Sequence, residues 1–224
     1  MLKRFRGTLS LTLVLVLAGL PLWSEPNALV GVARTSGPAE INGVAFRAEG
    51  SVFSGDRVST GRSATLTLAA SAEERLQLEA NSRALVRKDT NANVISLEKG
   101  IVSFRSQGQT RAVIEAYGVE VRPVGNSPAI VQVALLSPAK AQVAALRGSV
   151  EVKTPGQSVI LKPGQGAMLT ATAQEPTGAG SGAGMSSGAK LALTLAIIGG
   201  LAASIAVPVA LANDNNLPVS PTTP

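Results

Sequence analysis

Short stretches of alternating apolar and polar residues fill the chain from residue 27 to residue 173, separated by Gly, Asn and Pro. The alternation is clearest at residues 64–68, 75–79, 119–121 and 150–152. Successive side chains of a strand point to opposite faces, so a period of two predicts strands with one buried face. No helical periodicity interrupts this region, and residues 71–75 read as a polar loop. The pattern therefore predicts an all-β fold.

A strand–Gly–strand unit recurs along this region. Residues 94–104 place Gly100 between two strand-like stretches, and residues 143–152 repeat the layout around Gly148. Residues 159–169 are a looser relative, and residues 39–44 carry an Asn-Gly pair suited to a tight hairpin. Repeats of this kind predict a β-solenoid-like stack of short strands and hairpins, in which each layer buries its face on the next.

Two apolar stretches flank the β-region. The first, residues 9–22, follows Lys3, Arg4 and Arg6 and predicts a signal peptide over residues 1–24; the alternative is an uncleaved anchor, and both place the following chain across the membrane. The second, residues 191–212, holds no charge. As a helix it would reach about 33 Å, enough for a hydrocarbon core of about 30 Å, which predicts a transmembrane helix. The alternative is a buried or interfacial helix.

These features divide the chain into five parts. They are a signal peptide (1–24), a β-domain (27–173), a linker rich in Gly, Ala and Ser (174–190), a transmembrane helix (191–212) and a disordered tail (213–224). In the apolar segment 191–212, small residues recur at Ala196, Gly200 and Ser204, a spacing that permits close helix contact. The orientation set by the first segment puts the β-domain outside the cytoplasm.

Composition narrows the chemistry. The chain has no Cys and no His, which removes disulfides, thiolate nucleophiles, Ser-His-Asp triads and His-ligated metals. Between residues 25 and 189 there are 16 basic and 13 acidic residues, a net +3, scattered singly, and aromatic residues are 3% of the chain. A nucleic-acid binder typically clusters its basic residues. We therefore expect no nucleic-acid partner, no cofactor and no metal.

The motifs resemble those of FecR domains. Residues 55–61, GDRVSTG, are similar to the G-D-x-[VIL]-x-T-G segment of that family, and residues 64–68, 75–82, 94–104 and 159–165 follow in the family's order. The likeness covers most of residues 29–172; residues 116–121 and 125–130 match the family pattern poorly. The resemblance implies an extracytoplasmic β-domain of a bacterial envelope that makes protein contacts. The cytoplasmic anti-sigma region found in signalling members is not expected here.

Within the GDRVSTG segment, Gly55 and Gly61 are expected at turns, while Asp56 and Thr60 are expected to bond backbone amides. This structural interpretation is favoured over ligand binding, and no binding residue is assigned.

Two other functions are alternatives to a role in protein–protein contacts. A cell-wall or glycan-binding domain would need exposed aromatic residues, and the candidates are Phe46, Phe53, Phe104 and Tyr117. An enzyme would need paired carboxylates, for which the candidates are Glu73, Glu74, Glu115 and Glu120. Residues five apart in one strand point to opposite faces, so Glu115 and Glu120 are not expected to share a site unless a turn intervenes at Gly118.

The sequence therefore predicts a non-enzymatic, extracytoplasmic domain of the bacterial inner membrane, tethered through residues 191–212. It would mediate contacts with an envelope protein or take part in envelope sensing. The alternative is a glycan-binding envelope domain.

Overall fold

The computed structural model describes residues 27–90, 92–173 and 191–198. Every regular element in these ranges is a strand, which confirms the all-β fold class. The strands are β1 (Leu29–Ser36), β2 (Ala39–Ile41), β3 (Val44–Phe46), β4 (Glu49–Phe53), β5 (Arg57–Thr60), β6 (Thr65–Ala69), β7 (Glu74–Leu78), β8 (Arg83–Lys88), β9 (Asn93–Ser106), β10 (Val113–Ala116), β11 (Val119–Val124), β12 (Ala129–Ser137), β13 (Lys140–Arg147), β14 (Ser149–Lys153), β15 (Ser158–Leu161), β16 (Gly166–Ala173) and β17 (Leu191–Ile198).

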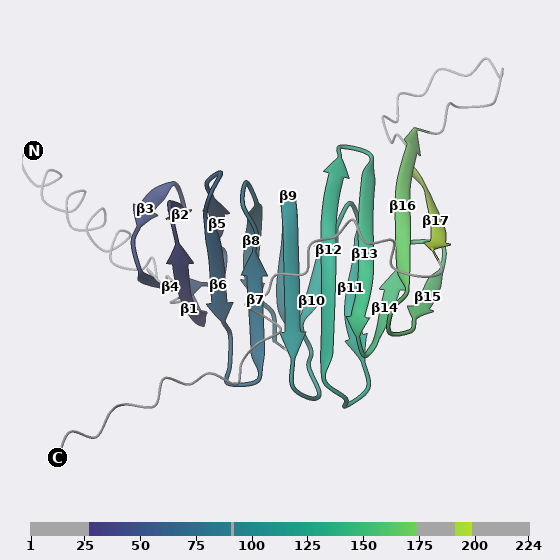
Figure 1. Ribbon diagram of the computed structural model, residues 1–224, viewed down its shortest axis with the longest axis horizontal. Coiled ribbons are helices and arrows are strands. Elements are labelled where there is room, and N and C mark those ends of the chain that lie inside the picture. Colours follow the sequence, from purple (N-terminus) through teal and green to yellow (C-terminus); the bar gives the residue numbers. More distant parts are fainter. Residues whose placement is uncertain (1–26, 91, 174–190, 199–224) are drawn as a thin grey trace, which may run out of the picture.

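The strands form two layers that advance together from one end of the molecule to the other (Figure 1). Sheet A has the order β4-β1-β6-β7-β9-β12-β13-β16-β17. Sheet B has the order β3-β2-β5-β8-β9-β10-β11-β14-β15. Neither sheet closes on itself, and strand β9 belongs to both.

Strand β9 joins the two sheets by bending at Gly100. Residues 93–99 pair with β8 in sheet B, whereas residues 100–106 pair with β12 in sheet A. Gly100 has a φ of +84°, and a Cβ there would lie 2.3 Å from Oγ and 2.7 Å from Cα of Ser82. The bend therefore requires glycine on both conformational and steric grounds. The sequence pattern suggested two strands with a turn at this position, but the structure shows one continuous 14-residue strand.

The core lies between the sheets and consists of aliphatic side chains at alternate strand positions. In sheet A, Leu68, Leu78 and Val102 are at most 1% exposed, and in sheet B, Val58 and Val86 are fully buried. All five belong to one continuous hydrophobic cluster. The two sheets thus bury their inner faces against each other. This burial supplies the main stabilisation of a chain that has no disulfides.

The structure does not show the solenoid-like stacking. Successive coils of a β-helix pair in parallel. Among the strands that the structure describes, every pairing is antiparallel except that between β9 and β10. Tight turns account for the pairs of consecutive strands such as β2–β3 and β6–β7, whereas β1–β4, β2–β5, β5–β8 and β11–β14 join strands that are separated in the sequence. At the Asn-Gly pair predicted for a hairpin, Asn42 and Gly43 have φ values of 53° and 78° and connect β2 to β3. The hairpin prediction is confirmed.

The structure also differs from prediction at the start of the C-terminal apolar segment. Residues 191–198, expected to begin a helix, form strand β17 and pair with β16 in eight antiparallel positions. Leu191, Leu193 and Leu195 alternate with smaller residues, so this stretch has the period of a strand as well as the hydrophobicity of a membrane segment. None of the residues that the structure describes belongs to a helix with the length and hydrophobicity of a membrane span.

Several predicted parts lie outside the described residues. They are the signal peptide (1–24), the linker (174–190), residues 199–212 of the predicted span and the tail (213–224).

We predict that Leu78→Ala lowers the free energy of unfolding by about 2–5 kcal/mol, because the site is fully buried and its neighbours cannot collapse into the space. Denaturant titration measures the loss. Leu136→Ala removes the same atoms at a side chain that is 53% exposed, and should change stability by no more than about 0.5 kcal/mol. Equal losses in the two variants would contradict the assigned core.

Candidate functional site

Cross-strand ion pairs cover much of the outer face of sheet B. Arg57 pairs with Glu98 at 2.8 Å and Arg87 pairs with Glu115 at 2.8 Å. Further along the sheet, Arg122 lies 2.8 Å from Glu120 and 3.2 Å from Glu151, and Lys153 lies 3.7 Å from Glu120. Their side chains are partly exposed to solvent, so these pairs contribute little to stability. Arg57 donates side-chain hydrogen bonds to the Glu98 carboxylate, and these bonds, together with the negative charge of Glu98, raise the pKa of Arg57.

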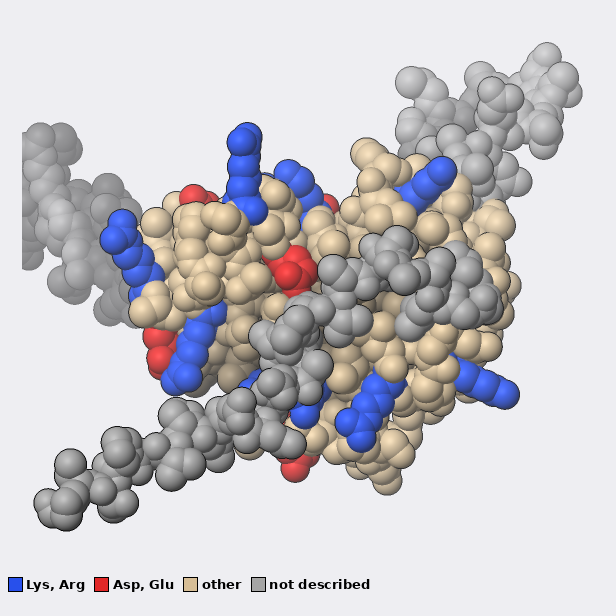
Figure 2. Space-filling model, in the orientation of Figure 1, with Lys and Arg blue, Asp and Glu red and all other residues tan. Residues whose placement is uncertain are grey.

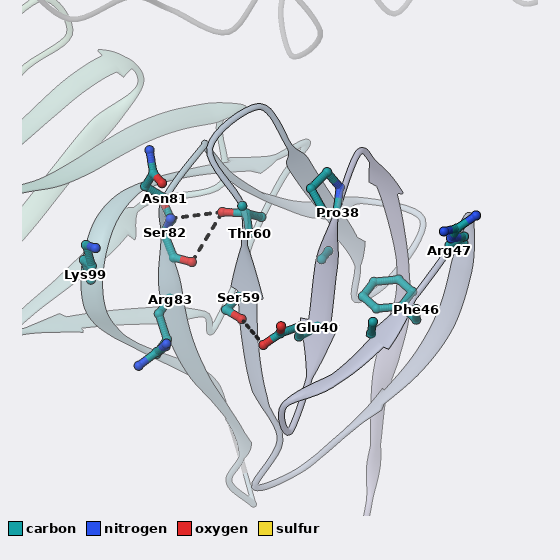
Figure 3. Close-up of a pocket in the computed structure, with 13 residues that line it drawn as sticks. Pro38, Glu40, Phe46, Arg47, Ser59, Thr60, Asn81, Ser82, Arg83 and Lys99 are labelled. Atoms are coloured by element: carbon teal, nitrogen blue, oxygen red, sulfur yellow. Dashed lines mark hydrogen bonds between the residues drawn. The ribbon is translucent and has the colours of Figure 1, made fainter.

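A groove of about 380 Å³ crosses the end of this face that contains β2, β5, β8 and β9 (Figure 3). Glu40 of β2 and Ser59 of β5 lie in the middle of the view, and the Ser59 hydroxyl donates to the Glu40 carboxylate at 3.4 Å. Lys99 and Arg47 lie toward opposite ends of the labelled set. The groove is open and follows the sheet surface, unlike the enclosed apolar pockets that hold small molecules.

The basic residues in the groove differ from those elsewhere on sheet B. Arg83 of β8 and Lys99 of β9 are direct Cα partners in the ladder. Among the described residues, neither they nor Arg47 has an ion pair. Like charges directly opposite one another in a sheet are destabilising. With Glu40 as the single carboxylate among the described residues lining the groove, this surface carries a net charge of +2.

The GDRVSTG segment borders this region, and its polar side chains bond to the protein itself. Asp56 accepts hydrogen bonds from the Asn42 side chain and from the backbone N–H of Phe53, both at 2.7 Å. The Thr60 hydroxyl accepts from the backbone N–H of Ser82 at 3.0 Å and donates to the carbonyl of Glu79. These bonds agree with the structural interpretation of Asp56 and Thr60.

Glycine is needed at both ends of the segment. Gly55 has a φ of +93°, and a Cβ on Gly61 would lie 2.9 Å from Cγ of Pro38. Gly55 is therefore explained by its backbone conformation and Gly61 by the close approach of Pro38.

Several polar residues on the outer face of sheet A are buried. Gln77, Ser103 and Gln132 occupy one row across β7, β9 and β12, and each is at most 3% exposed. The Gln132 side-chain amide donates to Ser103 Oγ at 3.2 Å, and Gln77 donates to the Glu79 carboxylate at 2.9 Å. Partial burial raises the pKa of Glu79, and the bond from Gln77 opposes that shift. The low exposure of this row makes it a poor site for an external ligand.

The candidate aromatic residues do not form a stacking platform. Phe104 is 2% exposed and belongs to the core, while Phe46 packs partly against the core and lines the groove. Phe53 and Tyr117 are 40% and 38% exposed. Phe53 ends β4 in sheet A, whereas Tyr117 lies in the β10–β11 turn of sheet B, where its hydroxyl donates to the carbonyl of Ser137 at 2.9 Å. The two exposed rings thus lie on different sheets.

The condition stated for Glu115 and Glu120 is met in the structure. Glu115 and Glu120 are direct cross-strand partners, because the chain turns between them at Tyr117 and Gly118, with φ values of 51° and 76°. The exception allowed at Gly118 is therefore what occurs. Glu115 is held by Arg87, and it also accepts from Ser96 Oγ at 2.6 Å. This carboxylate pair is part of the ion-pair ladder.

The remaining carboxylate candidates are also accounted for. Glu74 accepts from Thr110 and, at 3.2 Å, from Asn93, and Glu73 is exposed. In the described parts of the chain, no three His, Cys, Asp or Glu residues are grouped so as to hold a metal ion. On the face seen in Figure 2, Lys and Arg are dispersed and form no dense basic patch.

No protein-family model matches the sequence, and no curated protein matches it. Among solved structures, the chain is similar to two crystal structures of a candidate anti-sigma factor from Parabacteroides distasonis ATCC 8503. The identities are 16% and 14%, with TM-scores of 0.43 and 0.42. Each alignment covers 51% of this chain and 54% of the other, so the chain spans about half the length of these structures. Similarity this low transfers no function.

We predict that Lys99→Glu stabilises the protein, by roughly 0.2–1 kcal/mol, because it turns a like-charge cross-strand pair with Arg83 into an opposite-charge pair. Thermal unfolding at low salt measures the gain, which should shrink in high salt. The matched control is Lys140→Glu, which makes the same charge change at an exposed position outside the groove. An equal gain from the control would show that net charge, not the Arg83–Lys99 juxtaposition, is responsible.

Proposed function

We propose that this chain is a non-enzymatic, membrane-tethered domain on the outer side of a bacterial inner membrane that makes protein–protein contacts. Export through residues 1–24 and a tether in residues 191–212 are supported by the basic and apolar pattern of the sequence. The resemblance to FecR domains supports the envelope setting. The groove across β2, β5, β8 and β9 is the contact surface.

The juxtaposition of Arg83 and Lys99 carries this proposal. Two cations held opposite each other without an anion lower stability, and an anionic partner would relieve their repulsion. The other strands of the same face show that this sheet can neutralise its cations internally, as Arg57 and Glu98 do. The groove is therefore suited to an acidic segment of another envelope protein, lying in extended form across the strands.

Two other anionic or polar ligands fit less well. Single-stranded nucleic acid is generally held by aromatic residues that stack on its bases, and Phe46 is the only aromatic residue among the described ones that line the groove. A glycan would need a similar stacking surface, and the exposed Phe53 and Tyr117 lie on different sheets. A protein segment rich in Asp and Glu needs no such surface.

The first test uses the full-length chain in detergent and a synthetic peptide rich in Asp and Glu, labelled for fluorescence anisotropy. We predict that Arg83→Glu with Lys99→Glu weakens binding about tenfold or more, because two attractive charges become repulsive. Lys140→Glu with Lys162→Glu makes the same change in net charge at exposed positions outside the groove and should bind nearly as the parent does.

A peptide with Asn and Gln in place of its acidic residues should bind weakly to all variants. The proposal fails if the groove variant and the control variant bind the acidic peptide equally, or if the neutral peptide binds as well as the acidic one. It also fails if the affinity for the acidic peptide is unaffected by salt.

The second test addresses location. Val44 is 70% exposed and the chain has no cysteine of its own, so Val44→Cys provides a single accessible thiol. We predict that a membrane-impermeant maleimide labels this thiol in intact spheroplasts as fully as in lysed ones. Val58→Cys, at a fully buried position, is the control for labelling of unfolded protein. Labelling of Val44→Cys only after lysis would place the domain inside the cell.

A further inference from the structure

Strand β16 would be the edge of sheet A if β17 were not paired with it. Its sequence, GAMLTATA, contains neither a charged residue nor proline, the two devices that most often protect exposed edges from pairing with another chain. Leu169 points to the core, while Met168 and Thr170 lie on the outer side of sheet A. In the structure this edge is covered by β17 over its full length, from the Gly166–Ile198 pair to the Ala173–Leu191 pair.

The strand that covers this edge is also the first part of the predicted membrane span. With residues 191–198 in sheet A, 14 apolar residues remain, from 199 to 212. Fourteen residues of helix reach about 21 Å, which is short of a hydrocarbon core of about 30 Å. The backbone of residues 191–198 cannot be part of the sheet and of a membrane helix at the same time. The chain can therefore either pair these residues with β16 or use them to span the membrane.

We propose that the free side of β16 pairs with two alternative strands. It pairs with β17 of the same chain when the C-terminal segment lies outside the bilayer, and with β16 of a second copy when that segment spans the bilayer. The inference rests on the membrane tether of the proposed function. Two identical edge strands can pair antiparallel about a two-fold axis, so one surface is complementary to itself. Tethering two copies to one membrane also raises their effective concentration.

The site is well suited to strand pairing. An uncharged edge brings no like-charge repulsion when it meets its own copy, and both partners place apolar residues on the core side.

Cysteine cross-linking tests both halves of the inference in a chain without native cysteine. Thr170 and Thr194 are direct Cα partners, at a separation typical of antiparallel strands and suitable for a disulfide. In the membrane fraction we expect no intramolecular disulfide in Thr170→Cys with Thr194→Cys. In the same fraction we expect a short bis-maleimide to link Thr170→Cys into dimers about tenfold more efficiently than Ser51→Cys, on the opposite edge of sheet A.

Each outcome decides a separate point. An intramolecular disulfide in chains that resist carbonate extraction would overturn the exclusion between covering and spanning. Absence of linked dimers in that fraction, or equal linking through Ser51→Cys, would overturn the pairing of β16 with a second copy. Extraction of the chain by carbonate would instead contradict the membrane tether, and it is measured by fractionation without reference to any cross-link.

Discussion

The fold depends on a single strand that belongs to two sheets. Strand β9 runs through the middle of both layers and changes from one to the other at Gly100, where Ser82 leaves no room for a side chain. Because its first half pairs with β8 and β10 and its second half with β7 and β12, the two sheets cannot shift relative to each other without breaking its hydrogen bonds. The position of the groove follows, since Lys99 directly precedes the bend and is thereby fixed opposite Arg83.

The outer faces of the two sheets have different roles. On sheet B, most charged residues pair across strands, and such exposed pairs contribute little to stability. Their value is in registry and solubility, because a one-residue slip of any strand would turn its charges toward the core. The groove departs from this arrangement at one point, where two cations are opposed. On sheet A, the polar row of Gln77, Ser103 and Gln132 is instead buried, while exposed charges such as Arg34 and Glu49 lie at the β1–β4 end of the sheet.

Sequence reasoning succeeded where the determining interactions are local. Alternation over three to five residues identified strands β6, β7, β11 and β14, and an Asn-Gly pair identified the β2–β3 hairpin. Both signals are local, because strand period and turn conformation depend on neighbouring residues. Sequence reasoning did less well where contacts between residues distant in the sequence determine the structure. Gly100 has a positive φ, like a turn glycine, but its role comes from Ser82. Whether Glu115 faces Glu120 depended on the turn at Gly118. The start of the apolar segment was assigned to a helix because its hydrophobicity outweighed its alternation.

The groove itself could not be predicted. Three cations line it without an ion pair among the described residues. Arg47 comes from the β3–β4 connection, Arg83 from β8 and Lys99 from β9, and the sequence shows them only as scattered charges. Nothing in the order of residues indicates that Arg83 and Lys99 are cross-strand partners while Arg57 finds Glu98. The antiparallel register of β5, β8 and β9 determines which of these charged residues become neighbours.

Strands that advance steadily along one axis, with both sheets open at each end, give this architecture an adjustable length. A duplicated hairpin inserted between existing hairpins would meet the same spacing between the sheets and the same alternation of apolar and polar positions. It would move the neighbouring strands along the axis without changing the packing around β9. Descendants of such a gene could therefore differ in length by whole hairpins while keeping the same cross-section.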